Sequence, residues 1–286
     1  MEKLRTRIPL AIRVMTVGLG AMILAALLVP VLVDRDPTHQ ELRQRLRAPA
    51  FLGGKAENFL GTDQLGRDVL IRLVYATRTT LLISFSGMLV ALTVGTILGV
   101  VAGLYGGWPD QIATFIIDAN LSIPFMLIAL LAASVFGTSV TILILIVGFT
   151  GWSGFARLVR GQIMSIRRMS FIESSNALGA SDLRIIAEHL LPNIASSMIV
   201  YGTMRISAFI LLESSVSFLG LGIQPPSISL GLMVSNGRNY LVNQWWLAVF
   251  PSIVIMLVVF QISLVGDWLR DVLDPKIKDR GKGMPV

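Results

Sequence analysis

The sequence contains no cysteine and only two histidines. The absence of cysteine excludes a disulfide framework and a metal site built on thiolates. His39 and His189 lie far apart in the chain, which argues against a metal centre built from histidine. Charged residues are also scarce, at 14% of the chain, whereas a soluble domain carries about 25%. We therefore expect no resident metal and a chain unlike an ordinary soluble domain.

Long apolar stretches take the place of the missing charges. Hydrophobic residues make up 54% of the chain and the mean hydropathy is +0.74. A helix needs roughly 20 apolar residues to cross the hydrocarbon core of a bilayer. The sequence therefore predicts an all-α integral membrane protein of about six transmembrane helices. The candidate spans are Pro9–Val33, Leu81–Leu104, Ile112–Phe136, Val140–Leu158, Ile194–Leu212 and Leu247–Trp268.

The net charge of +7 is better explained by basic cytoplasmic segments of a membrane protein than by a nucleic-acid partner. Basic residues gather in the N-terminal tail, in 157–184 and in 276–282, which lie on one side of an even number of spans. The positive-inside rule assigns that side to the cytoplasm, together with both termini. No basic stripe interleaved with aromatic residues lies outside the spans, so we expect no nucleic acid as a partner and membrane lipid in its place.

The spans divide the chain into four parts. We expect an N-terminal cytoplasmic tail and first span over 1–33, an extracytoplasmic loop over 34–80, a transmembrane core over 81–268 and a cytoplasmic tail over 269–286. The first apolar stretch is too long for the core of a signal peptide, so we predict that it is kept as a membrane helix.

The most informative segment lies between the fourth and fifth predicted spans, inside the cytoplasmic loop 159–193. A short helix is expected to end at Gly179, which adopts the left-handed geometry that closes helices. Ser181 or Asp182 then caps a second helix, and Pro192 is expected to end it. The apolar positions of the second helix recur at helical spacing, at Leu183, Ile186, Leu190 and Leu191. From the residues alone, this helix–turn–helix elbow is equally compatible with an interfacial helix resting among lipid headgroups.

The spacing of the elbow resembles the EAA loop of binding-protein-dependent ABC transporter permeases. Glu173 matches the glutamate of that motif, Gly179 its glycine, and Leu191 with Pro192 its closing pair. Ser174 and Ser175 stand where alanines are usual. The resemblance implies that the first short helix, with Ala177 and Leu178 at its end, is a coupling helix that docks into a groove on a separate ATPase subunit.

Three further motifs are typical of the C-type subunit of dipeptide and oligopeptide permeases. They run from Leu60 to Asp68, from Phe218 to Pro226 and from Gly266 to Pro275, and the segments Tyr105–Asp110 and Ile123–Pro124 also fit. The resemblance implies a type I ABC importer permease fold in the cytoplasmic (inner) membrane. It also implies peptide import by alternating access, with nickel or another metal chelate as the alternative substrate.

The sequence lacks a phosphate-binding loop of the form Gly-x-x-x-x-Gly-Lys-Ser/Thr, because Gly53-Gly54-Lys55 is followed by alanine. We therefore predict a transport subunit that is not itself an enzyme and binds no cofactor, with ATP and Mg²⁺ held by other chains. The resemblance implies as partners a second homologous permease, one or two ATPase subunits and an extracytoplasmic substrate-binding protein.

Glycines recur every four residues in the second predicted span, at Gly95, Gly99 and Gly103. This spacing leaves bare backbone on one face of a helix, where another helix can approach closely. We expect generic packing within the bundle, with no information about substrate.

The fifth predicted span is the least apolar and supplies the candidates for a translocation pathway. These candidates are Tyr201, Arg205, Ser207 and Glu213. A charge at membrane depth is costly unless it faces protein or water, so Arg205 either lines the pathway or pairs with a carboxylate such as Asp118. Glu213 is expected near the outer interface in contact with water, and Trp245 and Trp246 are expected in an interfacial aromatic belt.

Two other classes of membrane protein remain as alternatives. A secondary transporter favours an inverted repeat and carboxylates near the bilayer midplane, and neither is evident in the sequence. An intramembrane enzyme needs a nucleophile and a base at matched depth, and both histidines fall in predicted loops. The sequence therefore favours the transport subunit over both.

Overall fold

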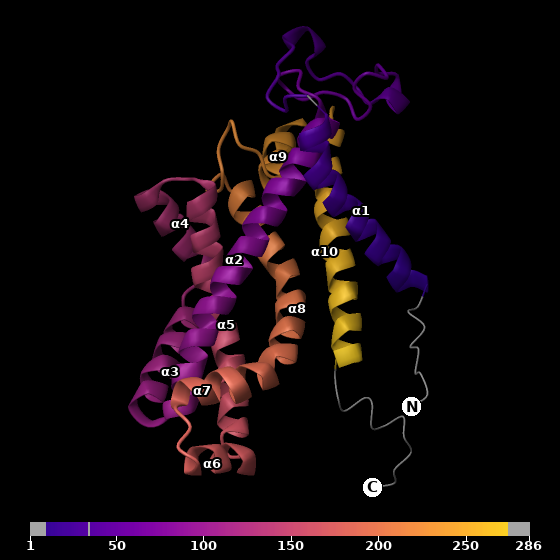
Figure 1. Cartoon of the computed structure of the whole chain (residues 1–286). Helices are drawn as coiled ribbons and strands as arrows, with labels where there is room; N and C mark the ends of the chain where they lie inside the picture. Colours follow the sequence, from indigo (N-terminus) through magenta and orange to yellow (C-terminus); the bar gives the residue numbers. More distant parts are fainter. Residues whose placement is uncertain (1–9, 34, 274–286) are drawn as a thin grey trace. The chain divides into compact units, whose positions relative to one another are not determined.

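The computed structural model describes residues 10–33 and 35–273, so Pro9 and the basic segment 276–282 lie outside the described residues. The chain forms two compact units, the first from residues 1–82 and 210–286 and the second from residues 83–209. The elements are α1 (Leu10–Leu32), η1 (Leu42–Gln44), η2 (Ala50–Leu52), α2 (Val69–Tyr105), α3 (Gly107–Ser122), α4 (Phe125–Phe136), α5 (Val140–Ile166), α6 (Ser170–Ala177), α7 (Asp182–Ile185), η3 (Ile186–Leu190), α8 (Leu191–Phe218), α9 (Leu230–Gly237), η4 (Arg238–Tyr240) and α10 (Trp246–Leu273), labelled in part in Figure 1.

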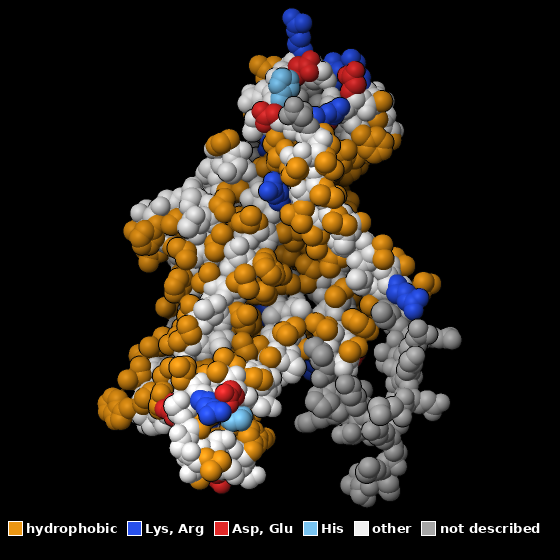
Figure 2. All heavy atoms as spheres, in the orientation of Figure 1, with side chains coloured by type: hydrophobic (Ala, Val, Ile, Leu, Met, Phe, Trp, Pro, Cys, Tyr) orange, Lys and Arg blue, Asp and Glu red, His pale blue; other side chains and the backbone are white. Residues whose placement is uncertain are grey.

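Among the described residues, five stretches of helix are long and apolar enough to cross a membrane: α1, α2, α5, α10 and the run from α7 through α8. Several extend beyond the predicted spans, since α2 begins at Val69 instead of Leu81 and α5 ends at Ile166 instead of Leu158. Hydropathy detects the apolar part of a helix, whereas the backbone hydrogen bonds continue into polar turns at its ends. Figure 2 shows hydrophobic side chains spread over the visible helix surfaces, as expected for surfaces that meet lipid or other membrane subunits.

The predicted span over Ile112–Phe136 is not one continuous helix. The segment forms two helices, α3 and α4, whose axes differ by 88° across a short break. Ile123 precedes Pro124 and has an extended backbone with φ −90° and ψ 123°, because the proline ring disfavours helical geometry in the residue before it. The total of six spans is reached only if this bent pair counts as one.

The second unit is held together by the glycine face of α2. A Cβ on Gly95 would lie 2.6 Å from the carbonyl oxygen of Trp152, and one on Gly99 would lie 2.7 Å from that of Ala156. At Gly103 the nearest atom of α5 is the Cβ of Ile163, at 2.9 Å. The predicted close approach of another helix is therefore confirmed, and the partner is α5.

The first unit has its own apolar core, to which α2, α9 and α10 contribute. Val69 and Leu73 pack there with Leu230, Met233 and Trp246. Trp246 is only 6% exposed, so its predicted place in an interfacial belt is wrong. Helix α1 packs against α10 (Figure 1), and Gly18 leaves room for the amide of Gln261, which a Cβ would approach to 2.8 Å.

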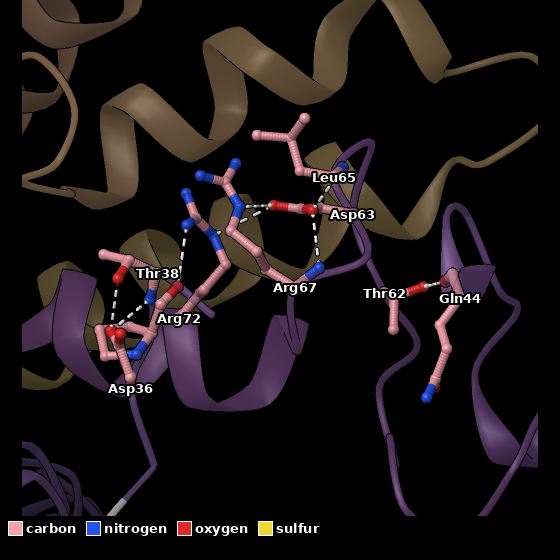
Figure 3. Close-up of polar contacts among 9 residues, drawn as sticks. Asp36, Thr38, Gln44, Thr62, Asp63, Leu65, Arg67 and Arg72 are labelled. Atoms are coloured by element: carbon pink, nitrogen blue, oxygen red, sulfur yellow. Dashed lines mark hydrogen bonds and ion pairs between the residues drawn. The ribbon is translucent and has the colours of Figure 1, made fainter. Parts of the chain in front are cut away.

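Residues 35–68 of the first unit form a lobe of turns, fixed by one carboxylate and two arginines (Figure 3). The Nε atoms of Arg67 and Arg72 lie 2.7 and 3.3 Å from the same oxygen of Asp63, and all three side chains are buried. The other oxygen of Asp63 accepts hydrogen bonds from the backbone N–H groups of Leu65 and Arg67. A buried carboxylate with this many donors specifies one conformation of the turn around Gly66, whose φ is +77°.

A second turn in this lobe is stabilised by Asp36. Its Oδ1 atom accepts hydrogen bonds from the hydroxyl group of Thr38 at 2.6 Å and from the backbone N–H of Thr38 at 2.7 Å, as Figure 3 shows. These two donors favour the ionised carboxylate and hold the pKa of Asp36 below its ordinary value.

Candidate functional site

The segment between α5 and α8 folds as the predicted helix–turn–helix. Residues 170–193 form this elbow. Gly179 follows α6 with φ +80°, and its N–H donates to the carbonyl oxygen of Asn176 at 2.9 Å. Nothing lies within 4 Å of the place of a Cβ on Gly179. Backbone conformation alone therefore demands glycine. Ser181 caps α7 by accepting a hydrogen bond from the N–H of Arg184 at 3.4 Å, as predicted.

The prediction that Pro192 ends the second helix is wrong. The chain runs from α7 through the π-helical turn η3 into α8, whose second residue is Pro192. Proline is tolerated near the start of a helix, and the wider π turn shifts the register of the backbone hydrogen bonds, so the missing N–H breaks no regular ladder. The side-chain amide of Asn193 donates to the carbonyl oxygen of His189 at 2.6 Å and so satisfies part of the altered turn.

The elbow is anchored on an apolar cluster of the second unit. Ile172 of α6, Ile185 of α7 and Leu190 of η3 are buried. They pack in one cluster with side chains of α2, α5 and α8, which are Val100, Val159, Ile163 and Ile194. Leu183 of α7 does not belong to this cluster, because it is 76% exposed.

His189 binds the two arms of the elbow together. Its Nε2 atom lies 3.2 Å from the hydroxyl oxygen of Ser175, and its ring packs edge-on against Phe171 at a centroid distance of 5.9 Å. The hydroxyl of Ser174 donates to the carbonyl oxygen of Ser170 within α6. The hydroxyl of Ser175 likewise donates to the carbonyl oxygen of Phe171 at 2.9 Å, so both serines are satisfied within α6, and Ser175 alone adds a contact with His189 that alanine lacks.

The predicted coupling residues form the outer surface of the elbow. Leu178 is 89% exposed and Met169, just before α6, is 46% exposed. Two of the predicted residues are half-buried, Ser175 and Leu191, and six are exposed, Glu173, Ser174, Ala177, Leu178, Gly179 and Pro192. A short helix that presents apolar side chains beside a carboxylate offers a surface for another protein.

The end of α2 and the start of α3 form a corner that meets α5 and α7. Two atoms of the Arg160 guanidinium, Nε and one terminal nitrogen, donate to the two oxygens of Asp110, the second at 2.8 Å. Arg167, the residue after α5, donates to the carbonyl oxygens of Gly103 and Leu104 at 3.1 and 2.8 Å. The sequence motif Tyr105–Asp110 pointed to this corner, but gave no sign of the partner arginines.

The predicted pathway residues of the second unit lie on α8. The guanidinium carbon of Arg205 lies 5.9 Å from the centroid of the Tyr201 ring, which packs edge-on against Phe155. The Nε atom of Arg205 is buried without a hydrogen-bond partner among the described residues. Ser207 is also buried. The alternative pairing of Arg205 with Asp118 is wrong, since the Asp118 carboxylate lies 2.8 Å from a guanidinium nitrogen of Arg157.

Glu213 lies in the first unit, and its predicted solvation is wrong because it is 0% exposed. The hydroxyl group of Ser217 donates to one carboxylate oxygen at 2.7 Å and that of Ser214 to the other at 3.4 Å. The hydroxyl groups of Thr80 and Ser229 also interact with the carboxylate. Their oxygens accept from backbone N–H groups at the start of α9, so their protons are free to point at Glu213.

An open pocket of about 390 Å³ lies along the end of α8 in the first unit. Its walls come from α8, α9 and α10, and they include Ser214, Ser215, Phe218, Gly231, Val234 and Ser252. A Cβ on Gly231 would come within 2.3 Å of the carbonyl oxygen of Ser214. Glycine therefore allows the close packing of α9 on α8 that forms one wall.

The elbow lies in a part of the chain that matches a known protein family. A family model described as "Binding-protein-dependent transport system inner membrane component" matches residues 95–279. The matched region contains the whole elbow, the corner that follows α2, and Glu213.

Characterised relatives cover most of the chain. The glutathione transport system permease protein GsiD of Pectobacterium atrosepticum is 39% identical over 79% of this chain and 75% of the relative. The dipeptide transport system permease protein DppC of Alkalihalophilus pseudofirmus is 36% identical over 90% of this chain and 83% of the relative. The oligopeptide transport system permease protein OppC of Haemophilus influenzae is 36% identical over 77% of this chain and 70% of the relative.

Solved structures share the fold. A chain of the MetNI methionine ABC transporter in an inward-facing conformation matches with a TM-score of 0.56 and 21% identity, covering 72% of this chain and 97% of that chain. A chain of an amino acid ABC transporter matches with a TM-score of 0.55, over 71% of this chain and 94% of that chain.

Proposed function

Because the chain belongs to the family of binding-protein-dependent transport system inner membrane components, we propose that it is the permease subunit of an ATP-driven importer that carries peptides across the cytoplasmic membrane by alternating access. The observation that carries the proposal is the elbow, an exposed short helix fixed between two membrane helices. The dipeptide and oligopeptide permeases among its relatives favour peptides as the substrate. A nickel or other metal chelate is the alternative.

In this proposal, α6 is the coupling helix. Glu173, Ala177 and Leu178 present a mixed acidic and apolar surface to an ATPase subunit. ATP and Mg²⁺ bind to that partner, because the chain has no glycine-rich loop able to hold phosphates. The chain supplies the pathway while its partners supply the hydrolysis.

The assembly that we propose contains a second homologous permease, one or two ATPase subunits and an extracytoplasmic substrate-binding protein. The many exposed apolar side chains of the membrane helices support contacts with lipid and with the second permease. We place both termini and the elbow in the cytoplasm on the basis of the positive-inside rule, and the 35–68 lobe on the opposite side.

Arg205 is the candidate for direct contact with substrate. It lies about 20 Å from either end of α8 at a rise of 1.5 Å per residue, in the middle of this long helix. A peptide carries a terminal carboxylate, and the guanidinium group of the half-buried Arg205 side chain is a suitable donor. We assign Tyr201 and Ser207 to the same stretch of pathway. We assign Glu213 a role in packing α9 against the end of α8.

The test of the coupling role is co-purification of the tagged chain from its native membrane. The wild type is expected to bring down a second permease and at least one ATPase. Glu173→Arg reverses the charge on the docking surface, and Gly179→Pro is incompatible with φ +80°. Both variants should insert in the membrane and lose the ATPase.

The matched control is Glu57→Arg, which makes the same charge reversal at an exposed glutamate of the 35–68 lobe. It should retain every partner. A wild-type chain that purifies alone, or variants that keep the ATPase as well as the control does, would show that the elbow is only an interfacial helix.

The test of the substrate is uptake of a labelled dipeptide and of a labelled nickel chelate by vesicles that contain the complete transporter. Dipeptide uptake should depend on ATP and fall in Arg205→Gln, while Arg205→Lys keeps the charge and part of the rate. Uptake of the chelate without uptake of the peptide would reject the peptide assignment and retain the importer.

A further inference from the structure

The corner between α2 and α3 is tied to both sides of the elbow by polar contacts. Asp110 of α3 pairs with Arg160 of α5. Arg167, three residues before α6, binds the last carbonyl groups of α2. Tyr105, the last residue of α2, interacts through its hydroxyl group with the carboxylate of Asp182 at the start of α7. The contacts therefore reach α5, which leads into the elbow, and α7, which follows the turn inside the elbow.

The Asp110–Arg160 contact has the geometry of a rigid link. Two guanidinium nitrogens face two carboxylate oxygens, so the pair resists rotation as well as separation. The side chains are 17% and 27% exposed, which shields the pair from part of the solvent screening. It joins residues of two helices fifty positions apart in the chain.

Arg167 performs a different task at the same corner. The last carbonyl groups of a helix have no partner within that helix, and Arg167 supplies donors to two of them in α2. Because Arg167 directly follows α5 and precedes α6, the end of α2 is attached to the segment that leads into the elbow.

Beneath these polar contacts lies the apolar cluster that already contains Val100 of α2, Ile163 of α5, Ile172 of α6 and Ile185 of α7. A close-packed cluster of this kind transmits displacement and does not absorb it. We propose that Tyr105, Asp110, Arg160, Arg167 and Asp182, which we call the corner clamp, are positioning residues through which movement of the elbow shifts α2 and α3. This inference rests on the proposed coupling role of the elbow.

A second ion pair between the same two helices provides the comparison. Asp118 of α3 and Arg157 of α5 are also 2.8 Å apart, but both side chains are 59% exposed. If any salt bridge between α3 and α5 sufficed for coupling, the two pairs would be equivalent. If the corner clamp carries the coupling, only the Asp110–Arg160 pair should affect it.

The experiment uses the complete transporter in liposomes, with ATP hydrolysis and labelled-dipeptide uptake measured separately. Asp110→Arg and Arg160→Asp should each leave ATP hydrolysis within about twofold of the wild type while lowering the peptide transported per ATP by roughly tenfold, in the usual range for coupling between sites. The double variant, which restores an ion pair with reversed polarity, should recover to within about threefold.

Conservative variants keep the test valid if a charge reversal prevents assembly. Arg160→Lys keeps the charge and removes the two-pronged contact, and it should lower the coupling ratio by roughly threefold with normal hydrolysis. Asp118→Arg is the control and should leave the ratio unchanged.

Three results would overturn the inference: an unchanged coupling ratio in the Asp110 and Arg160 variants, an equal loss in Asp118→Arg, or a double variant no better than the single ones. None of these affects the proposed function. That function fails on a separate result, a wild-type complex that lacks an ATPase or shows no ATP-dependent uptake.

Discussion

The two units of the chain use arginine–carboxylate contacts in different ways. In the first unit, Asp63 is shared by Arg67 and Arg72, all within one short stretch, with side chains that are at most 9% exposed. In the second unit, Asp110 and Arg160 come from separate helices and remain partly exposed. The first arrangement fixes the local fold of a lobe, whereas the second connects helices that meet an exposed elbow.

This difference separates a region that holds a conformation from one that transmits a movement. Burial makes the Asp63 cluster expensive to disturb, because an arginine that loses its carboxylate stays buried and uncompensated. The partial exposure of the Asp110–Arg160 pair lowers the cost of losing it, while its two parallel hydrogen bonds keep α3 and α5 moving together. Four substitutions test how burial, close packing and hydrogen bonding stabilise each unit.

The largest loss of stability is expected from Asp63→Ala. Removing the shared carboxylate leaves two buried arginines without their counter-charge, which costs about 3–5 kcal/mol of unfolding free energy. The measurement is equilibrium unfolding in mixed micelles. Asp36→Ala, at an exposed acid of the same lobe, serves as the control and should cost much less; equal losses would mean that burial does not distinguish the two sites.

Gly99→Ala is expected to weaken the packing of α2 on α5. Its Cβ would lie 2.7 Å from the carbonyl oxygen of Ala156, and a backbone atom cannot move aside cheaply, so the cost is about 1–3 kcal/mol. The same unfolding measurement applies. Gly20→Ala in α1 is the control, because no atom lies within 4 Å of its Cβ and alanine favours a helix. A stable Gly99→Ala protein would contradict the close contact.

Glu213→Gln tests the buried polar cluster of the first unit. The amide keeps the size of the side chain but replaces one acceptor oxygen by a donor that faces hydroxyl protons, at a cost of about 1 kcal/mol. Ser215→Ala, two residues along α8, removes only a hydroxyl that donates to the carbonyl of Leu211 within the helix. Equilibrium unfolding should show a lower unfolding free energy for Glu213→Gln than for Ser215→Ala. Equal free energies would show that the hydrogen bonds of the hydroxyl groups to Glu213 do not stabilise the unit.

The smallest effect concerns Thr38→Val. The Thr38 donors lower the pKa of Asp36, so their stabilisation is present above the ordinary pKa of aspartate and disappears as the pH falls through the lowered value. Loss of the hydroxyl should raise the pKa toward its ordinary value. An NMR titration of labelled aspartate carboxyls measures this, with Thr16→Val as the control because its hydroxyl donates to Ile12 within α1. No change in the Thr38 variant would refute the hydrogen bond.

Local signals predicted the elbow well. Gly179 ends a helix in the left-handed conformation and Ser181 caps the next one, because both features depend on residues adjacent in sequence. The glycines of α2 likewise predicted a close approach, since their spacing depends only on the period of the helix. The coupling role of Glu173, Ala177 and Leu178 stays a prediction.

Signals averaged over a window were less accurate. The hydropathy of residues 112–136 suggested one span, although Pro124 imposes a bend of 88°. Pro192 was expected to stop a helix, and the π turn before it allowed the helix to continue. The same residue type thus broke one helix and not another, because the outcome depended on the backbone register around it.

The sequence by itself determined the class of the protein, its apolar helices, its elbow and its family, because each follows from composition, helical period or neighbouring residues. Only the tertiary structure decided which charges are paired and which are buried. The carboxylate of Glu213 interacts with the hydroxyl groups of Thr80 and Ser229, and Asp110 finds Arg160 fifty residues away. Such partners are distant in the chain, so no local pattern encodes them, and only the packing of helices brings them within hydrogen-bonding distance.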